Sequence, residues 1–135
     1  MLHSKEFAAR REMLPQMLTE MTAEIKKYFT DSKWINRLKV AVEEILVNII
    51  DYSGSKKIYV SCEFLAEEQT LRFEFVDEGE LYNPLENKAQ VDIDAALDER
   101  EIGGLGIFLY ETIMDKLEYR CDDGKNHLLA YKNLV

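Results

Sequence analysis

Two polar side chains that could share a chemical task lie in the segment Ala41-Val42-Glu43-Glu44-Ile45-Leu46-Val47-Asn48. Glu44 and Asn48 are four residues apart, so on a helix they occupy one face, one turn from each other. The carboxylate can take a proton from an attacking oxygen, and the carboxamide oxygen can ligate a hard cation. Glutamate and asparagine also recur together on solvated helix faces, so the pair gains meaning only beside other motifs.

A second feature is Asp77, which follows a run of alternating apolar residues and precedes Gly79 by two positions. An aspartate at a strand end can accept a hydrogen bond from an exocyclic amine such as that of adenine. Glycine two residues later lets the backbone approach a flat ring closely. An ordinary Asp–Gly turn would have the same residues.

The third feature is the run Gly103-Gly104-Leu105-Gly106, which precedes a helical pattern. Backbone N–H groups at such a helix start can point at an anion, and the helix dipole favours negative charge there. No Lys-Ser/Thr pair follows, and the full Gly-x-Gly-x-x-Gly spacing is missing, so neither a Walker loop nor a dinucleotide fingerprint is present. A tight turn into the helix is the alternative interpretation.

The elements that must position these residues can be predicted from hydrophobic periodicity. Apolar residues at helical spacing predict one helix over about 14–28 and a second over 34–50, with Asp31 or Ser32 as its cap. Alternating residues predict two strands that form an antiparallel hairpin, and later a strand, a hairpin turn and a final strand. The two hairpin strands cover 58–64 and 71–75, the later strand 117–121, the hairpin turn 122–125 and the final strand 128–134. A third helix is expected after Gly106, and either a strand or an arm at 2–9.

Length and charge limit the function classes. At 135 residues the chain is predicted to form one domain, 1–135, and 47% hydrophobic with 32% charged residues fits a globular, water-exposed fold. The net charge of −9 makes nucleic acid and anionic membranes poor partners. Neither a signal peptide nor a membrane-length apolar run is present, so a cytoplasmic location is expected. Cys62 and Cys121 are both expected to be buried free thiols.

The order of the three features resembles the N, G1 and G2 boxes of the Bergerat ATP-binding fold shared by gyrase-type ATPases, histidine kinases and MutL. Within that superfamily the chain looks most like the small anti-sigma-factor serine/threonine kinases of bacterial partner-switching systems. The residues that carry this resemblance are Ala41 to Asn48, Asp77-Glu78-Gly79 with Asn83-Pro84, and Gly103 to Leu109; Met114-Asp115 and Asp123-Gly124-Lys125-Asn126 extend it. The resemblance covers about 14–134.

The resemblance implies an α/β fold (an α+β sandwich), in which helices cover one face of a mixed, mainly antiparallel sheet. It implies ATP and Mg²⁺ as cofactors and an acidic lid over about 85–102. Each candidate residue then has a role: Glu44 as general base, Asn48 as ligand of Mg²⁺, Asp77 on the adenine amine, Gly79 beside the base, and Gly104, Leu105 and Gly106 around the phosphates. Arg100, near the end of the lid, is either a phosphate contact or a solvated arginine.

The function implied is an ATP-dependent serine/threonine protein kinase and anti-sigma factor. Its partners would be a small STAS-type antagonist, which it phosphorylates, and a sigma factor; a homodimer is compatible with the resemblance. The alternative is a non-catalytic module that binds nucleotide only to set its shape and its partner. Two details depart from the family: Tyr52 replaces a histidine often found four residues after the N-box asparagine, and Gly79 is followed by Glu80-Leu81-Tyr82 rather than by a second glycine.

Overall fold

The central helix α2 (Ser32–Tyr52) begins at the predicted cap and buries one apolar stripe, as the sequence predicts. In this computed structural model, which describes residues 1–85 and 109–134, the Asp31 side chain caps the helix by accepting a hydrogen bond of 2.8 Å from the backbone N–H of Lys33. The buried residues recur at helical spacing and form one stripe: Leu38, Ala41, Val42, Ile45 and Leu46. This stripe leaves Glu44 and Asn48 at the margin of the core.

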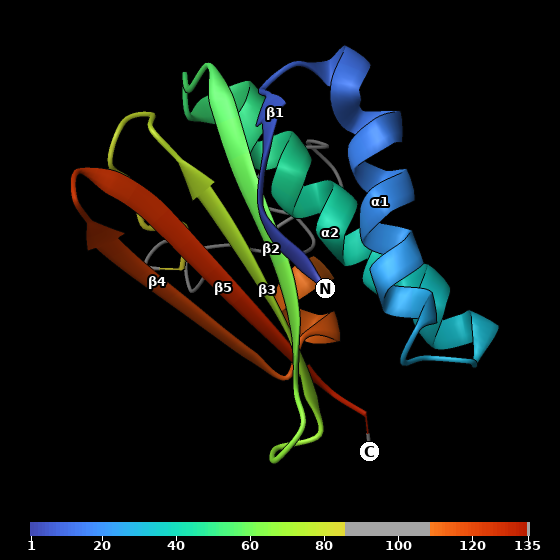
Figure 1. Ribbon diagram of the computed structural model, residues 1–135. Coiled ribbons are helices and arrows are strands. Elements are labelled where there is room, and N and C mark those ends of the chain that lie inside the picture. The colour runs from blue at the N-terminus through green and yellow to red at the C-terminus, as the bar shows by residue number, and fades with distance from the viewer. Residues whose placement is uncertain (86–108, 135) are drawn as a thin grey trace, which may run out of the picture.

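Two further helical segments precede α2. The short 3₁₀ helix η1 (Arg11–Met13) leads into α1 (Leu14–Lys26), in which Pro15 occupies the first turn, where its missing N–H costs no hydrogen bond. Met17, Met21 and Ile25 of α1 are fully buried. Figure 1 shows α1 and α2 side by side on the same face of the sheet.

Five strands form the sheet, in the order β1-β2-β3-β5-β4. Their bounds are β1 Leu2–Ala8, β2 Lys57–Leu65, β3 Thr70–Asp77, β4 Lys116–Asp122 and β5 Lys125–Asn133. All four pairings between these strands are antiparallel. The predicted α/β fold, with a mainly antiparallel sheet and helices on one face, is therefore confirmed, and residues 2–9 form an edge strand rather than a free arm.

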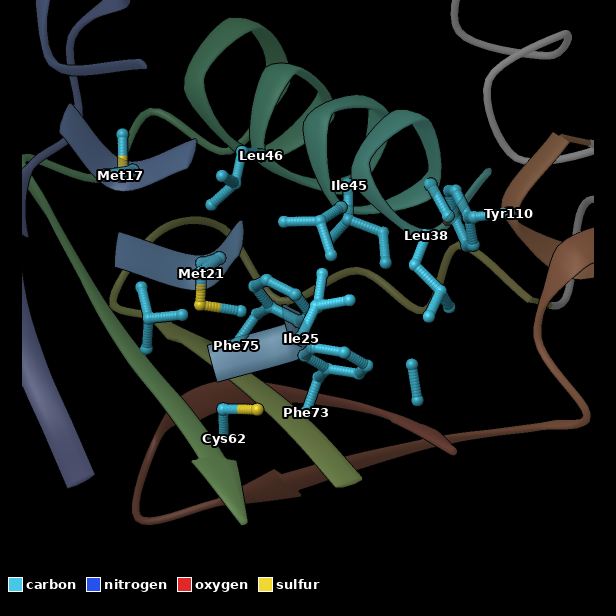
Figure 2. Close-up of a cluster of buried hydrophobic side chains, with 14 of the residues drawn as sticks. Met17, Met21, Ile25, Leu38, Ile45, Leu46, Cys62, Phe73, Phe75 and Tyr110 are labelled. Atoms are coloured by element: carbon cyan, nitrogen blue, oxygen red, sulfur yellow. The ribbon is translucent and has the colours of Figure 1, made fainter. Parts of the chain in front are cut away.

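The core lies between this sheet and the two helices. Alternation along β3 turns Phe73 and Phe75 toward the helices, where both side chains are fully buried. Figure 2 shows these rings facing Ile25 of α1 and Ile45 of α2, with Tyr110 beside α2. Residues 109–113 are helical, and Met114, directly after them, is also buried.

The hairpin between β4 and β5 has the predicted turn chemistry. Asp123 and Gly124 both adopt positive φ, +55° and +71°, as a type I′ turn requires at its two central residues. Nothing lies within 4 Å of the position that a Cβ on Gly124 would take, so this glycine is favoured by its backbone angle and not by crowding.

The expectation for the two cysteines is half wrong. Cys62 in β2 is buried, and this burial raises the pKa of its thiol to about 12. Cys121 is exposed, contrary to the prediction, because it lies near the end of the edge strand β4, next to the hairpin turn. The alternation pattern alone cannot show that an edge strand is left uncovered at its end.

Candidate functional site

Glu44 is half-buried on α2. Among residues 1–85 and 109–134 its carboxylate makes neither a hydrogen bond nor an ion pair. Burial, followed by the negative charge of the adjacent Glu43, raises the pKa of Glu44 above its ordinary value. A carboxylate that binds a proton more readily is a stronger base. The adjacent Glu43 is exposed, whereas Glu44 is half-buried.

Asn48, one turn further along α2, carries an unpaired polar atom. Its Nδ2 atom is buried, and no other described residue accepts a hydrogen bond from it. Buried amides are normally paired, so an orphan of this kind fits a site that a ligand completes. The neighbouring Tyr110 is buried, and that burial raises its pKa; the Asn48 amide lies near enough to the Tyr110 hydroxyl to act on this pKa in the opposite direction but does not reach the hydroxyl in hydrogen-bond geometry. The unpaired Nδ2 atom of Asn48 therefore suits a polar ligand at this face of α2.

Asp77, the last residue of β3, is almost fully buried. Its Oδ1 atom accepts two hydrogen bonds of 3.0 Å, one from the backbone N–H of Gly79 and one from Nδ2 of Asn126. Its Oδ2 atom has no hydrogen-bond partner in the part of the chain that the structure describes, and it is not sealed from solvent. One carboxylate oxygen is thus fixed and the other is left to meet a ligand.

The segment after Asp77 is fastened to the end of α2. The backbone N–H of Glu80 donates to the Ser53 carbonyl oxygen at 3.0 Å, and that of Glu78 donates to Oγ of Ser55 at 3.0 Å. Because Ser53 caps α2 about one and a half turns after Asn48, these contacts hold the end of β3 beside the part of the helix that carries Asn48. The structure therefore fastens the segment after Asp77 to the C-terminal end of α2, the helix that carries Glu44 and Asn48.

Gly79 is required by this contact. A Cβ atom at this position would lie 2.1 Å from the Ser53 carbonyl oxygen, far inside van der Waals contact. The absence of a side chain at Gly79 therefore lets the segment after β3 pack against the end of α2. That Gly79 also lets a flat ring approach stays a prediction.

Asn126 of β5 belongs to the segment Asp123 to Asn126 that extends the resemblance, but the sequence predicts no role for it. It is buried, and it lies directly opposite Asp77 in the β3–β5 pairing. The sequence signal that could have identified it is its type: an amide on the same strand face as the apolar Leu128 and Ala130 needs partners, and an aspartate at the end of another strand is a suitable one.

The remaining predicted site residues have different outcomes. Arg100, Gly104, Leu105 and Gly106, together with nearly all of the predicted 85–102 lid, lie outside the described residues. Tyr52, which replaces the family's histidine, has a largely exposed side chain.

Away from these residues, a hollow of about 420 Å³ lies near the first turn of α2. Trp34 in its wall is covered by the Lys132 ammonium, 4.0 Å from the ring centroid. None of the predicted site residues lines this hollow. Within the described ranges no cluster of three or more His, Cys, Asp or Glu side chains could hold a metal, and no helix is both long and apolar enough to cross a membrane.

The family to which this fold and site belong can now be stated. Residues 7–132 match the family described as the histidine kinase-like ATPase domain, which is nearly the whole chain. The chain therefore belongs to that family, whose description implies the use of ATP.

The curated relatives that match are serine-protein kinases named RsbW. The chain is 30% identical over 95 residues to RsbW of Listeria monocytogenes and 28% identical over 93 residues to RsbW of Halalkalibacterium halodurans. Each match covers 67% of this chain but only 60% and 57% of the respective relative.

Among solved structures, the Acinetobacter baumannii histidine kinase AdeS aligns with a TM-score of 0.54 at 12% identity. The alignment covers 99% of this chain and 68% of that one. At this identity the likeness shows the fold alone.

Proposed function

We propose that the protein is an ATP-dependent serine/threonine protein kinase that acts as an anti-sigma factor in a partner-switching system. The observation that carries this proposal is the Glu44–Asn48 pair, which is half-buried and in which the Glu44 carboxylate and the Asn48 Nδ2 atom have no hydrogen-bond partner among residues 1–85 and 109–134. The similarity to the serine-protein kinases named RsbW supports it. A helix face that served only solvation would not leave a buried amide unpaired.

In the proposed reaction Glu44 accepts the proton of a serine or threonine hydroxyl on the protein substrate. The hydroxyl oxygen forms a bond to the γ-phosphorus of ATP while the bond from that phosphorus to the β–γ bridging oxygen breaks, which releases ADP. The raised pKa of Glu44 suits this step because it makes the carboxylate a stronger base.

The other residues bind and orient the nucleotide. Asp77 would accept a hydrogen bond from the adenine amine through its free Oδ2 atom. Asn48 would hold Mg²⁺, and when bound this ion neutralises phosphate charge.

The role of the glycine run stays a proposal made from the sequence. Gly104, Leu105 and Gly106 would surround the phosphates, with Arg100 nearby, and 85–102 would act as a lid. The single domain over 1–135 stays a proposal as well.

The proposed partners are a small STAS-type antagonist, as phosphoacceptor, and a sigma factor. A homodimer in the cytoplasm, without direct contact to nucleic acid or membrane, is part of the same proposal. The net charge of −9 agrees with protein partners that present basic patches.

The test is phosphotransfer from Mg-ATP labelled at the γ-phosphate to a purified STAS-type antagonist. The proposal expects labelled antagonist with the wild type and a loss of at least about 100-fold with Glu44→Ala. The matched control is Glu43→Ala, which removes the neighbouring exposed carboxylate and should keep near wild-type transfer. Binding of ATP without transfer by the wild type would favour the non-catalytic module, and transfer that survives Glu44→Ala would refute the assigned base.

A further inference from the structure

The side chain of Asn126 makes four hydrogen bonds in the buried space between β3, β4 and the segment after Asp77. Its Nδ2 atom donates to Oδ1 of Asp77 at 3.0 Å and to the Glu80 carbonyl oxygen at 2.9 Å. Its Oδ1 atom accepts from the backbone N–H of Tyr82 at 3.0 Å and from the Tyr119 hydroxyl. The amide is therefore saturated on both sides.

Chemistry fixes which way this amide points. A carboxylate and a carbonyl can only accept hydrogen bonds, and a backbone N–H can only donate one. If the Asn126 amide were turned over, its oxygen would face the Asp77 carboxylate and the Glu80 carbonyl, and its NH₂ group would face the Tyr82 N–H. Three of the four contacts would then be repulsive, so Asn126 must present its donor to Asp77.

This donor changes what Asp77 can recognise. An ionised carboxylate with two free oxygens can pair with two neighbouring donors at once, as the ring N–H and the amine of guanine provide. At Asp77 the Oδ1 atom is already shared by Gly79 and Asn126, which leaves Oδ2 for one donor. A single acceptor matches the lone exocyclic amine of adenine.

We infer that Asn126 is a positioning residue that sets the selectivity of the nucleotide site for adenine over guanine. It does so by holding the Asp77 carboxylate in one orientation and occupying its Oδ1 atom, so that only Oδ2 is free for the base. This inference rests on the proposed function, because it takes Asp77 as the residue that reads the base.

The experiment is calorimetric titration of Mg-ATP and of Mg-GTP into the wild type and into Asn126→Ala, with thermal unfolding to show that each is folded. The wild type should prefer ATP strongly. Asn126→Ala should bind ATP about tenfold more weakly, as expected for the loss of hydrogen bonds to a charged group, and its ATP-to-GTP affinity ratio should fall by a similar factor. A purely structural role would lower both affinities together and leave the ratio unchanged.

Asn133→Ala is the matched control. It removes an amide from the other end of β5, where Oδ1 of Asn133 accepts a 2.8 Å hydrogen bond from the Thr70 hydroxyl, and it should change neither affinity. If Asn126→Ala does not fold, Tyr119→Phe decides: it removes one hydroxyl that holds Asn126 and should lower the ratio about two- to threefold.

If Asn126→Ala, or Tyr119→Phe where Asn126→Ala does not fold, keeps the wild-type ATP-to-GTP affinity ratio, the inference is overturned while the proposed ATP site stands. Failure of the wild type to bind ATP would overturn the proposed function, and the inference with it.

Discussion

Burial on α2 and the charge of Glu43 both disfavour the ionised form of Glu44. The pKa of Glu44 is therefore higher in the folded chain than its ordinary value of 4.5 in the unfolded one. Since the folded state binds this proton more tightly, stability falls as pH rises from about that value through the raised pKa, and the cost is fully present above the raised pKa. The carboxylate that the proposed reaction needs is thus kept at the expense of stability.

Replacing Glu44 by glutamine should make the protein more stable at pH 7. The expected gain is roughly a few tenths of a kcal/mol, because solvent screens a half-exposed carboxylate. The gain should vanish below about pH 4, where the wild-type group is neutral as well. Urea unfolding at both pH values measures this, with Glu67→Gln in the exposed β2–β3 turn as control. A Glu44→Gln variant that is less stable at pH 7 would contradict the account.

Two glycines should respond differently to the same substitution. Gly79→Ala puts a methyl group into the Ser53 carbonyl, so we expect a loss of about 2–3 kcal/mol of unfolding free energy and weaker ATP binding. Gly124→Ala meets no atom and suffers only from its positive φ, so its cost should be about 1 kcal/mol with ATP affinity unchanged. Chemical denaturation and calorimetry compare the two. Equal effects would show that the Ser53 contact is unimportant.

At the scale of elements, the two ends of α2 have different tasks. The helix has 21 residues and is therefore roughly 30 Å long, which separates its Asp31 cap from the junction with β3. The first end stabilises the helix, because the Asp31 side chain accepts from the Lys33 N–H. The second end positions the site, because Ser53 and Ser55 hold the segment after Asp77.

This division predicts a contrast between two small substitutions. Asp31→Ala should lower the unfolding free energy by about 1 kcal/mol and leave ATP affinity unchanged. Ser55→Ala leaves the Glu78 N–H without its acceptor, so it should cost a similar amount of stability and also weaken ATP binding several-fold. Thermal unfolding and titration calorimetry on both variants check this. A drop in ATP affinity that appears with Asp31→Ala but not with Ser55→Ala would reverse the assignment of the two ends.

At the scale of the whole molecule, hydrophobic periodicity and turn chemistry are enough to predict α2, the β2–β3 hairpin and the β4–β5 turn. The buried stripe of α2, the β2–β3 hairpin and the turn at Asp123-Gly124 all follow from local rules, and the structure has them. The pairing of β5 with β3 is not local, and it is this pairing that sets Asn126 opposite Asp77. The residue type of Asn126 indicates that it needs partners, but the strand order that makes Asp77 its partner has no local signature, and neither has the docking of Gly79 on Ser53.

The central claim is that the end of β3 and the last turns of α2 form one site for ATP. Titration calorimetry of Mg-ATP into the wild type and Asp77→Asn tests it most directly, with Asp122→Asn on β4 as a control for the loss of a carboxylate. The account predicts one ATP per chain, an affinity about 10- to 100-fold lower in Asp77→Asn, and no change in Asp122→Asn. Equal affinity of the wild type and Asp77→Asn for ATP, or no binding by the wild type, would contradict it.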